Sequence, residues 1–215
     1  MRARRPLGSG LVVLVIAAGL AIGCAKSPPR ERAWIPPRVD LARWGTIGMI
    51  EFSATGAPGL GSLASRTFLE ALQEAQPGTP VLELPDEPSV LAAIGGHALD
   101  PDTIRAIGEK YRVDALVVGR IEAQQTVPNV AFDSAARWVT ASAALQGGLD
   151  ARIFETRSGA TLWTRSAHAT EPLARVDVTT AGISGVGASD AEDARLHLVR
   201  SLVGHATTDF WGYWD

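Results

Sequence analysis

The feature that most constrains the fold is an apolar run near the middle of the chain, Val113-Asp114-Ala115-Leu116-Val117-Val118-Gly119. A single charge interrupts this run, which predicts a strand buried on both faces of a sheet. Two earlier strands are expected at Trp44 to Phe52 and at Val81 to Leu84, with helices between the strands. The order strand, helix, strand, helix, strand is typical of an α/β layer.

Amphipathic spacing predicts the helices of this layer. The first helix ends at Pro77-Gly78 and carries apolar or small residues at intervals of three and four: Leu60, Leu63, Ala64, Thr67, Phe68, Ala71, Leu72 and Ala75. A brief helix is expected from Pro88 to Ile94, before Gly95-Gly96. Asp100-Pro101 predicts the cap and first turn of a third helix.

The second half of the chain changes to a period of two. Residues alternate between apolar and polar from Arg137 to Thr156, where Gly147-Gly148 is expected to bend or bulge the strand without changing its phase. Residues 161–166 return after a turn, which predicts an antiparallel hairpin, and Ala174 to Ser189 is interpreted as a Gly- and Thr-rich loop. Asp190 begins a last helix. The expected fold is α/β (α+β): a mixed sheet flanked by helices, with a βαβαβ first half, an antiparallel hairpin and a C-terminal helix.

The N-terminus has the pattern of a secretory signal. Arg2, Arg4 and Arg5 precede an apolar stretch from Leu11 to Ile22, which is shorter than the roughly 20 residues of a membrane-spanning helix. Ala21-Ile22-Gly23-Cys24 resembles the lipobox of bacterial lipoprotein precursors. This resemblance implies cleavage before Cys24 and lipidation of Cys24. The alternative, a thiol buried in a core, fits poorly with the proline-rich segment that follows.

The expected organisation is a signal peptide at 1–23, a lipidated Pro-rich tether at 24–43 and a single domain at 44–215. Cys24 is the only cysteine, so no intramolecular disulfide is possible. Removal of residues 1–23 takes away three arginines and shifts the net charge from −3 to −6. This acidic balance disfavours binding to nucleic acid. Ala25 and Lys26, rather than Asp, follow Cys24. By resemblance to proteobacterial lipoproteins, this implies the outer membrane, with the domain facing the periplasm.

Three segments resemble the curli-secretion channel family of bacterial lipoproteins, the penicillin-binding-protein activator lipoproteins and the N-terminal domain of the Tol-system β-propeller protein. The segments are Ile47 to Phe52, Tyr111 to Ile121 and Asp150 to Trp163. The resemblance implies a layered α/β domain that works by protein contact in envelope assembly, secretion or regulation. It implies no catalysis.

One departure from the channel members concerns their membrane hairpins. Channel members insert two β-hairpins per subunit, and each strand needs about 9 to 11 residues. Residues 124–150 supply one plausible strand, whereas 127–129 and 135–137 make a poor partner strand, and Thr179 to Ser189 is too short for a second hairpin. The sequence therefore disfavours a channel subunit, which stays open as the alternative function.

The sequence gives only weak evidence for a metal site, a phosphate-binding loop or a catalytic nucleophile. Asp193 with His197 and His205 with Asp209 have metal-like spacing but lack a third ligand nearby, so solvated helix positions are the favoured interpretation. Gly56 to Gly61 lacks the Lys-Ser/Thr ending of a phosphate loop, and Ser53 and Ser62 lack a nucleophile elbow. We expect no catalytic residue, metal or cofactor, and no enzyme activity.

The aromatic C-terminal tail is the candidate interface. Phe210, Trp211, Tyr213 and Trp214 lie within five residues, and such side chains are enriched at interfaces and membrane surfaces. The favoured interpretation is the alternative, that these side chains cover the open end of the sheet. The expected partners are a membrane, through the lipid on Cys24, and another envelope protein or further copies of the chain, which makes a homo-oligomer possible. The predicted function is that of a lipid-anchored envelope lipoprotein acting as a protein-binding module.

Overall fold

The computed structural model describes residues 32–125, 129–133, 138–179, 182–188 and 190–215. The chain divides into two units, Met1–Trp34 with Trp214–Asp215 and Ile35–Tyr213, and each is described by itself. A separate two-stranded sheet pairs strand β1 (Trp34–Ile35) with strand β10 (Tyr213–Trp214). The predicted signal peptide, Cys24 and the first part of the tether lie outside the described residues.

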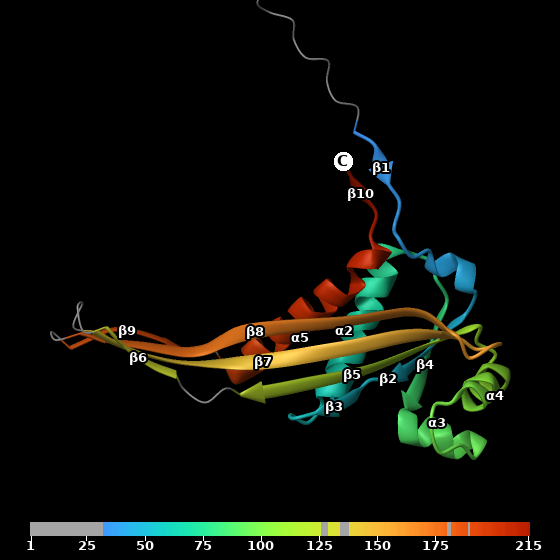
Figure 1. Ribbon diagram of the computed structural model, residues 1–215, viewed down its shortest axis with the longest axis horizontal. Coiled ribbons are helices and arrows are strands. Elements are labelled where there is room, and N and C mark those ends of the chain that lie inside the picture. The colour runs from blue at the N-terminus through green and yellow to red at the C-terminus, as the bar shows by residue number, and fades with distance from the viewer. Residues whose placement is uncertain (1–31, 126–128, 134–137, 180–181, 189) are drawn as a thin grey trace, which may run out of the picture. The chain divides into compact units, whose positions relative to one another are not determined.

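One mixed sheet organises the unit Ile35–Tyr213, in the strand order β4-β2-β5-β7-β8-β9 (Figure 1). Strand β2 (Ile47–Glu51) lies between β4 (Val81–Asp86) and β5 (Ala115–Gln125) and is parallel to both. The other neighbours are antiparallel: β7 (Trp138–Glu155), β8 (Thr161–Thr179) and β9 (Gly182–Ala188). Two short strands join from the side, because β3 (Ser53–Thr55) pairs with β5 and β6 (Asn129–Asp133) pairs with β7.

The helices are α2 (Leu60–Ala75), α3 (Glu87–Ile94), α4 (Pro101–Tyr111) and α5 (Ala191–Ala206), with 3-10 turns η1 (Leu41–Trp44) and η2 (Thr207–Phe210). The expected α/β fold class is confirmed, including the βαβαβ first half and the C-terminal helix. Asp86, Asp100 and Asp190 cap α3, α4 and α5 by accepting backbone N–H groups of the first turns. The hydrogen bond from the Thr103 N–H lowers the pKa of Asp100.

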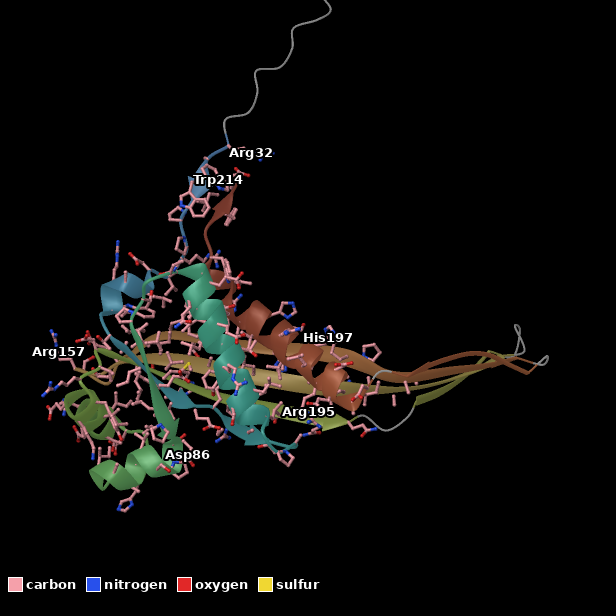
Figure 2. All side chains as sticks on the ribbon, turned by 180° about the vertical axis from the view of Figure 1, so that it is seen from behind. Arg32, Asp86, Arg157, Arg195, His197 and Trp214 are labelled. Carbon is pink, nitrogen blue, oxygen red and sulfur yellow. The ribbon has the colours of Figure 1, made fainter. Side chains whose placement is uncertain are left out.

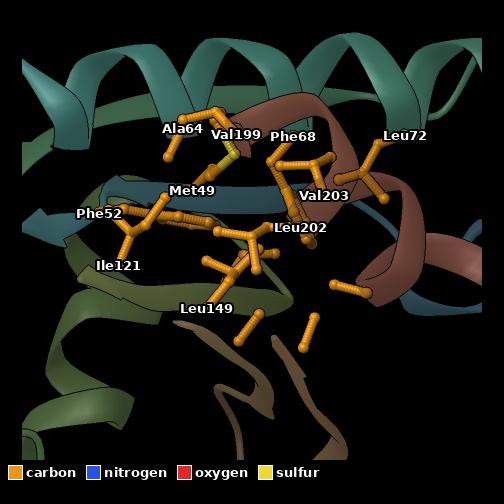
Figure 3. Packing of buried hydrophobic residues seen from close by; sticks show 14 of the residues in the cluster. Met49, Phe52, Ala64, Phe68, Leu72, Ile121, Leu149, Val199, Leu202 and Val203 are labelled. Carbon is orange, nitrogen blue, oxygen red and sulfur yellow. The ribbon is translucent and has the colours of Figure 1, made fainter. Parts of the chain in front are cut away.

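Two hydrophobic cores lie on opposite faces of the parallel strands. The larger core is covered by α2 and α5, and Figure 3 shows Met49 and Ile121 of the sheet among side chains of both helices. The smaller core contains Ile50 and Leu116 together with residues of α3 and α4. Alternate residues of β2 and β5 therefore enter different cores, as the apolar run Val113 to Gly119 predicts.

The structure corrects three expectations about the chain's elements. Ala174 to Ser189 is not a loop, because β8 continues to Thr179 and β9 spans Gly182–Ala188. The first strand was expected to end at Phe52, but Ser53 to Thr55 continue the pairing as β3 beside β5. Part of the segment assigned to the tether packs with the domain, since Leu41 is fully buried and its N–H donates to Gln76 Oε1 at 2.7 Å.

Asp209 joins three parts of the domain. Its carboxylate accepts hydrogen bonds from Trp163 Nε1 at 3.2 Å and from Arg165 Nη1 at 3.4 Å, and it lies 3.6 Å from Arg38 Nη1. Its carbonyl accepts the Val39 N–H at 3.0 Å. The Asp209 side chain is 14% exposed and Trp163 is 7% exposed, so the hydrogen bond between them is largely shielded from water, whereas the Arg38 side chain is 83% exposed. Asp209 therefore fixes the N-terminal segment and strand β8 against η2.

The first prediction concerns Gly119, the glycine in the central strand. A Cβ at this position would lie 2.6 Å from Cε2 of Phe52, a ring buried in the larger core. We expect Gly119→Ala to lower the free energy of unfolding by about 1–3 kcal/mol through overpacking, as measured by urea denaturation. The matched control is Gly204→Ala in α5, where an added Cβ meets nothing within 4 Å. It should stabilise by about 0.5–1 kcal/mol, and equal effects of the two substitutions would contradict the packing argument.

The second prediction concerns the Asp209 junction. Asp209→Ala removes the acceptor of the Trp163 Nε1 hydrogen bond. Because Trp163 is only 7% exposed, its N–H would be left without compensation from bulk water. We expect the free energy of unfolding to fall by about 1–3 kcal/mol in urea denaturation. Glu70→Ala, at an exposed position of α2, is the control and should change it by less than about 0.5 kcal/mol.

Candidate functional site

Strands β6 to β9 form a two-hairpin arm, which we define as residues 129–133, 138–143, 174–179 and 182–188. Asn129 to Asp133 pair with Ser142 to Trp138, which makes the first hairpin. Ala174 to Thr179 pair with Ala188 to Gly182, which makes the second. The expectation that residues 124–150 have no convincing partner strand, and that a second hairpin is absent, is therefore wrong. The arm lies beyond the end of α5 in Figure 1.

The strand register divides the residues of the arm into two sets. Phe132, Val139, Val178 and Ile183 are in register across the four strands, and so are Val130, Ala141, Val176 and Val186. Successive residues of a strand belong to opposite faces, so these residues share one face. The apolar set is completed by alanines, and its members are Val130, Phe132, Val139, Ala141, Ala143, Ala174, Val176, Val178, Ile183, Val186 and Ala188.

The opposite set is small or polar, with Trp138 as its large apolar member. It consists of Asn129, Ala131, Asp133, Trp138, Thr140, Ser142, Arg175, Asp177, Thr179, Gly182, Gly185 and Gly187. All charged residues of the arm's described strands, Asp133, Arg175 and Asp177, belong to this set. The arm is therefore an amphipathic sheet.

The apolar set continues the face of the sheet that α5 covers closer to the domain. Along β7, Val139 and Ala141 are in phase with Leu149, Ala151 and Ile153, which are buried in the larger core. Helix α5 approaches β7 closely at Gly147, where an added Cβ would lie 2.9 Å from Leu198 Cδ2. The absence of a side chain at Gly147 thus permits α5 to pack closely on β7. The register of β7 continues through Gly147 without a shift. Past the end of α5, no helix of the described residues covers the arm.

The outer strands of the arm have open edges. Among the described strands, β6 pairs only with β7 and β9 pairs only with β8. An open edge presents unpaired backbone N–H and C=O groups to any further strand. Strand β9 has the sequence Gly-Ile-Ser-Gly-Val-Gly-Ala, which contains neither a charge nor a proline that would discourage pairing.

The aromatic tail divides at Phe210. Phe210 is fully buried and lies 4.8 Å from Trp163, centroid to centroid. Trp211, Tyr213 and Trp214 are 38%, 59% and 64% exposed. Phe210 therefore covers the end of the sheet, as one interpretation of the tail expects. The three predicted interface residues, Trp211, Tyr213 and Trp214, do not.

A cavity of about 910 Å³ lies at the carboxyl ends of β2 and β4. Glu51, Phe52, Asp86, Glu87 and His97 contribute to its walls. Two of the carboxylates have structural roles, because Glu51 accepts a hydrogen bond from the Ser62 hydroxyl and Asp86 caps α3. The Gly56 to Gly61 segment turns the chain into α2 beside this cavity, and Gly56 and Gly59 take positive φ values of 117° and 76°.

The remaining candidate residues do not form a reaction centre. Figure 2 shows His197 on α5, where it is exposed, as are His205 and Asp193. Asp209 contacts Trp163 and Arg165, as described above. Among the residues that the structure describes, no three His, Cys, Asp or Glu side chains gather as metal ligands. Within the same residues, no helix has the length and apolar character required to cross a bilayer.

Comparison with known proteins gives distant structural likenesses. No protein-family model matches the chain, and no curated protein matches it. The PelC dodecamer from Paraburkholderia phytofirmans is similar at 12% identity and a TM-score of 0.43, over 84% of this chain and 96% of that one. Lipoprotein GNA1162 from Neisseria meningitidis is similar at 18% identity and a TM-score of 0.38, over 60% and 83%. The LpoB C-terminal domain from Escherichia coli is similar at 10% identity and a TM-score of 0.33, over 59% and 82%.

One of these proteins is identified as a lipoprotein. Nothing among them supports the expected likeness to the Tol-system β-propeller protein. At these identities and TM-scores, the likenesses assign no function to the chain.

Proposed function

We propose that this chain is a lipid-anchored protein of the bacterial envelope that binds copies of itself through the two-hairpin arm. The observation that carries the proposal is the register of the arm, which gives one face only Val, Ile, Phe and Ala. Self-association gives a specific form to the predicted protein-binding role. The proposed role is non-catalytic.

An apolar face that no described helix of the same chain covers is unfavourable in water. Contiguous exposed apolar patches on soluble monomers are usually small, and larger ones mark interaction sites. Burial of apolar surface contributes about 25 cal/mol per Å². Association that removes this face from water therefore stabilises the arm.

The edges of the arm make pairing between copies directional. The β6 edge of one copy and the β9 edge of the next are different surfaces, so pairing between them is heterologous. Heterologous contacts form a closed ring when the rotation between copies closes and an open filament when it does not. Lipidation of Cys24 would confine all copies to one membrane surface, which favours closed assemblies in a common orientation.

A second candidate is a subunit of an oligomeric outer-membrane secretion channel. The specific observation in its favour is the presence of two hairpins per chain. The resemblance implies two hairpins for channel members, whereas the sequence pattern disfavours them. The separation of all described charges of the arm onto one face is also compatible with contact between lipid and the other face.

The third prediction tests self-association with two adjacent residues of β7. Val139 belongs to the apolar set and Thr140 to the polar set. We expect Val139→Lys to weaken assembly at least about tenfold, equivalent to about 1.4 kcal/mol, because a charge is placed in the buried contact. Thr140→Lys, in register with Asp177, should assemble like the parent. The measurement is the mass of detergent-extracted protein by light scattering after size-exclusion chromatography.

Retention of the domain fold is checked by thermal melting of both variants. A monomeric parent, or identical assembly by both variants, would overturn the proposal. Ion conductance of the purified protein in planar bilayers distinguishes the two candidates, since only a channel subunit should conduct. Conductance that Val139→Lys abolishes and Thr140→Lys retains would establish the second candidate.

A further inference from the structure

Trp34 and Trp214, which we call the tryptophan pair, bring the two ends of the described chain together. Their ring centroids are 5.2 Å apart at an interplanar angle of 57°. The Asp215 N–H donates to the Ala33 carbonyl at 3.0 Å, which holds the two segments side by side. Figure 2 shows Trp214 on β10.

Both rings remain largely open to solvent despite this contact. Trp34 is 50% exposed and Trp214 is 64% exposed. Tryptophan combines a large apolar body with one N–H donor, which suits a surface that is apolar on one side and wet on the other. Such rings are enriched at the boundary between lipid headgroups and acyl chains.

The chain length between Trp34 and Cys24 restricts what the pair can contact. Trp34 follows Cys24 by ten positions, which span at most about 36 Å when fully extended. A lipid on Cys24 would therefore keep Trp34 within this distance of the bilayer. Tethering at such short range raises the effective concentration of a second binding surface to the millimolar level or above.

The charge of the same segment differs in sign from the rest of the chain. Residues 25–34 contain Lys26, Arg30 and Arg32 and one acid, Glu31, which gives a net charge of +2. The predicted mature chain carries −6, so residues 35–215 carry −8. Basic residues near an anionic membrane surface strengthen binding to it. The segment next to the tryptophan pair is thus the part of the chain with charge complementary to anionic lipid.

We propose that the tryptophan pair is a second membrane contact, which inserts its rings into the lipid headgroup region beside the anchor on Cys24. The proposal rests on the lipid anchor of the proposed function and adds a docking surface to it. The tether then ends at the bilayer rather than holding residues 33–35 and 213–215 away from it. Reach from the anchor and complementary charge favour lipid over a protein as the occupant of this surface.

Depth-dependent fluorescence quenching tests the proposal on the lipidated protein reconstituted into vesicles. The vesicles contain phosphatidylcholine with or without phosphatidylglycerol, and a fraction of the lipid is brominated at a shallow acyl position. We expect quenching of tryptophan emission in the parent, stronger quenching with phosphatidylglycerol, and loss of this quenching in the double variant Trp34→Leu/Trp214→Leu. The control is Trp44→Phe, which removes a partly buried tryptophan packed against the larger core and outside the pair, and which should leave the quenching in place.

Quenching that is unchanged in the double variant would overturn the proposal. Quenching that is absent from the parent would do the same, provided that the protein floats with the vesicles. Failure to float would instead contradict the lipid anchor, and flotation and oligomer mass are measured on the same samples to separate these cases. Protection of the pair from aqueous acrylamide only after addition of envelope extract would assign the surface to a protein partner and overturn the lipid contact.

Discussion

The length difference between α5 and the strands beneath it determines much of this structure. Helix α5 has 16 residues and is about 24 Å long, whereas β7 has 18 residues and extends for about 60 Å. The helix can therefore cover less than half of the strand. Gly147 lies within the covered portion and allows Leu198 to approach the sheet closely. The covered portion becomes the domain core, and the remainder becomes the arm.

This division gives one strand pair two environments. Near the domain, Leu149 and Ala167 are in register and buried in the larger core. In the arm, Val139 and Val178 are in register on the same face, beyond α5. Because β7 and β8 are continuous through both regions, the proposed assembly would act on strands that the folded domain already holds. The domain already orders the inner parts of β7 and β8, which would lower the conformational entropy cost of assembly through the arm.

Much of the domain could be predicted from local patterns, and the arm could not. The stripes of α2 and α5 follow a helical period, and Leu60, Phe68, Leu198 and Phe210 are buried as that period indicates. The outer part of strand β8, beyond residue 173, was missed because a register shift near Leu173 moves its apolar positions from odd residues, such as Ala167, to even ones, such as Val176. A fixed period of two fails at such a bulge. Strand β9 was missed because three glycines give it weak strand propensity. The tryptophan pair joins residues at opposite ends of the chain, which no local pattern can reveal.

The proposed lipid anchor, the proposed membrane contact of the tryptophan pair and the proposed self-association of the arm are complementary in physical terms. A lipid on a tether limits a protein's distance from the bilayer but leaves its rotation free. Heterologous pairing of arms requires neighbouring copies in a common orientation, and each rotational freedom lost on assembly costs free energy. A second contact at the bilayer removes part of this freedom before assembly begins. On this argument, loss of the tryptophan pair weakens assembly on membranes and leaves assembly in detergent unchanged, because detergent offers no plane against which copies can align.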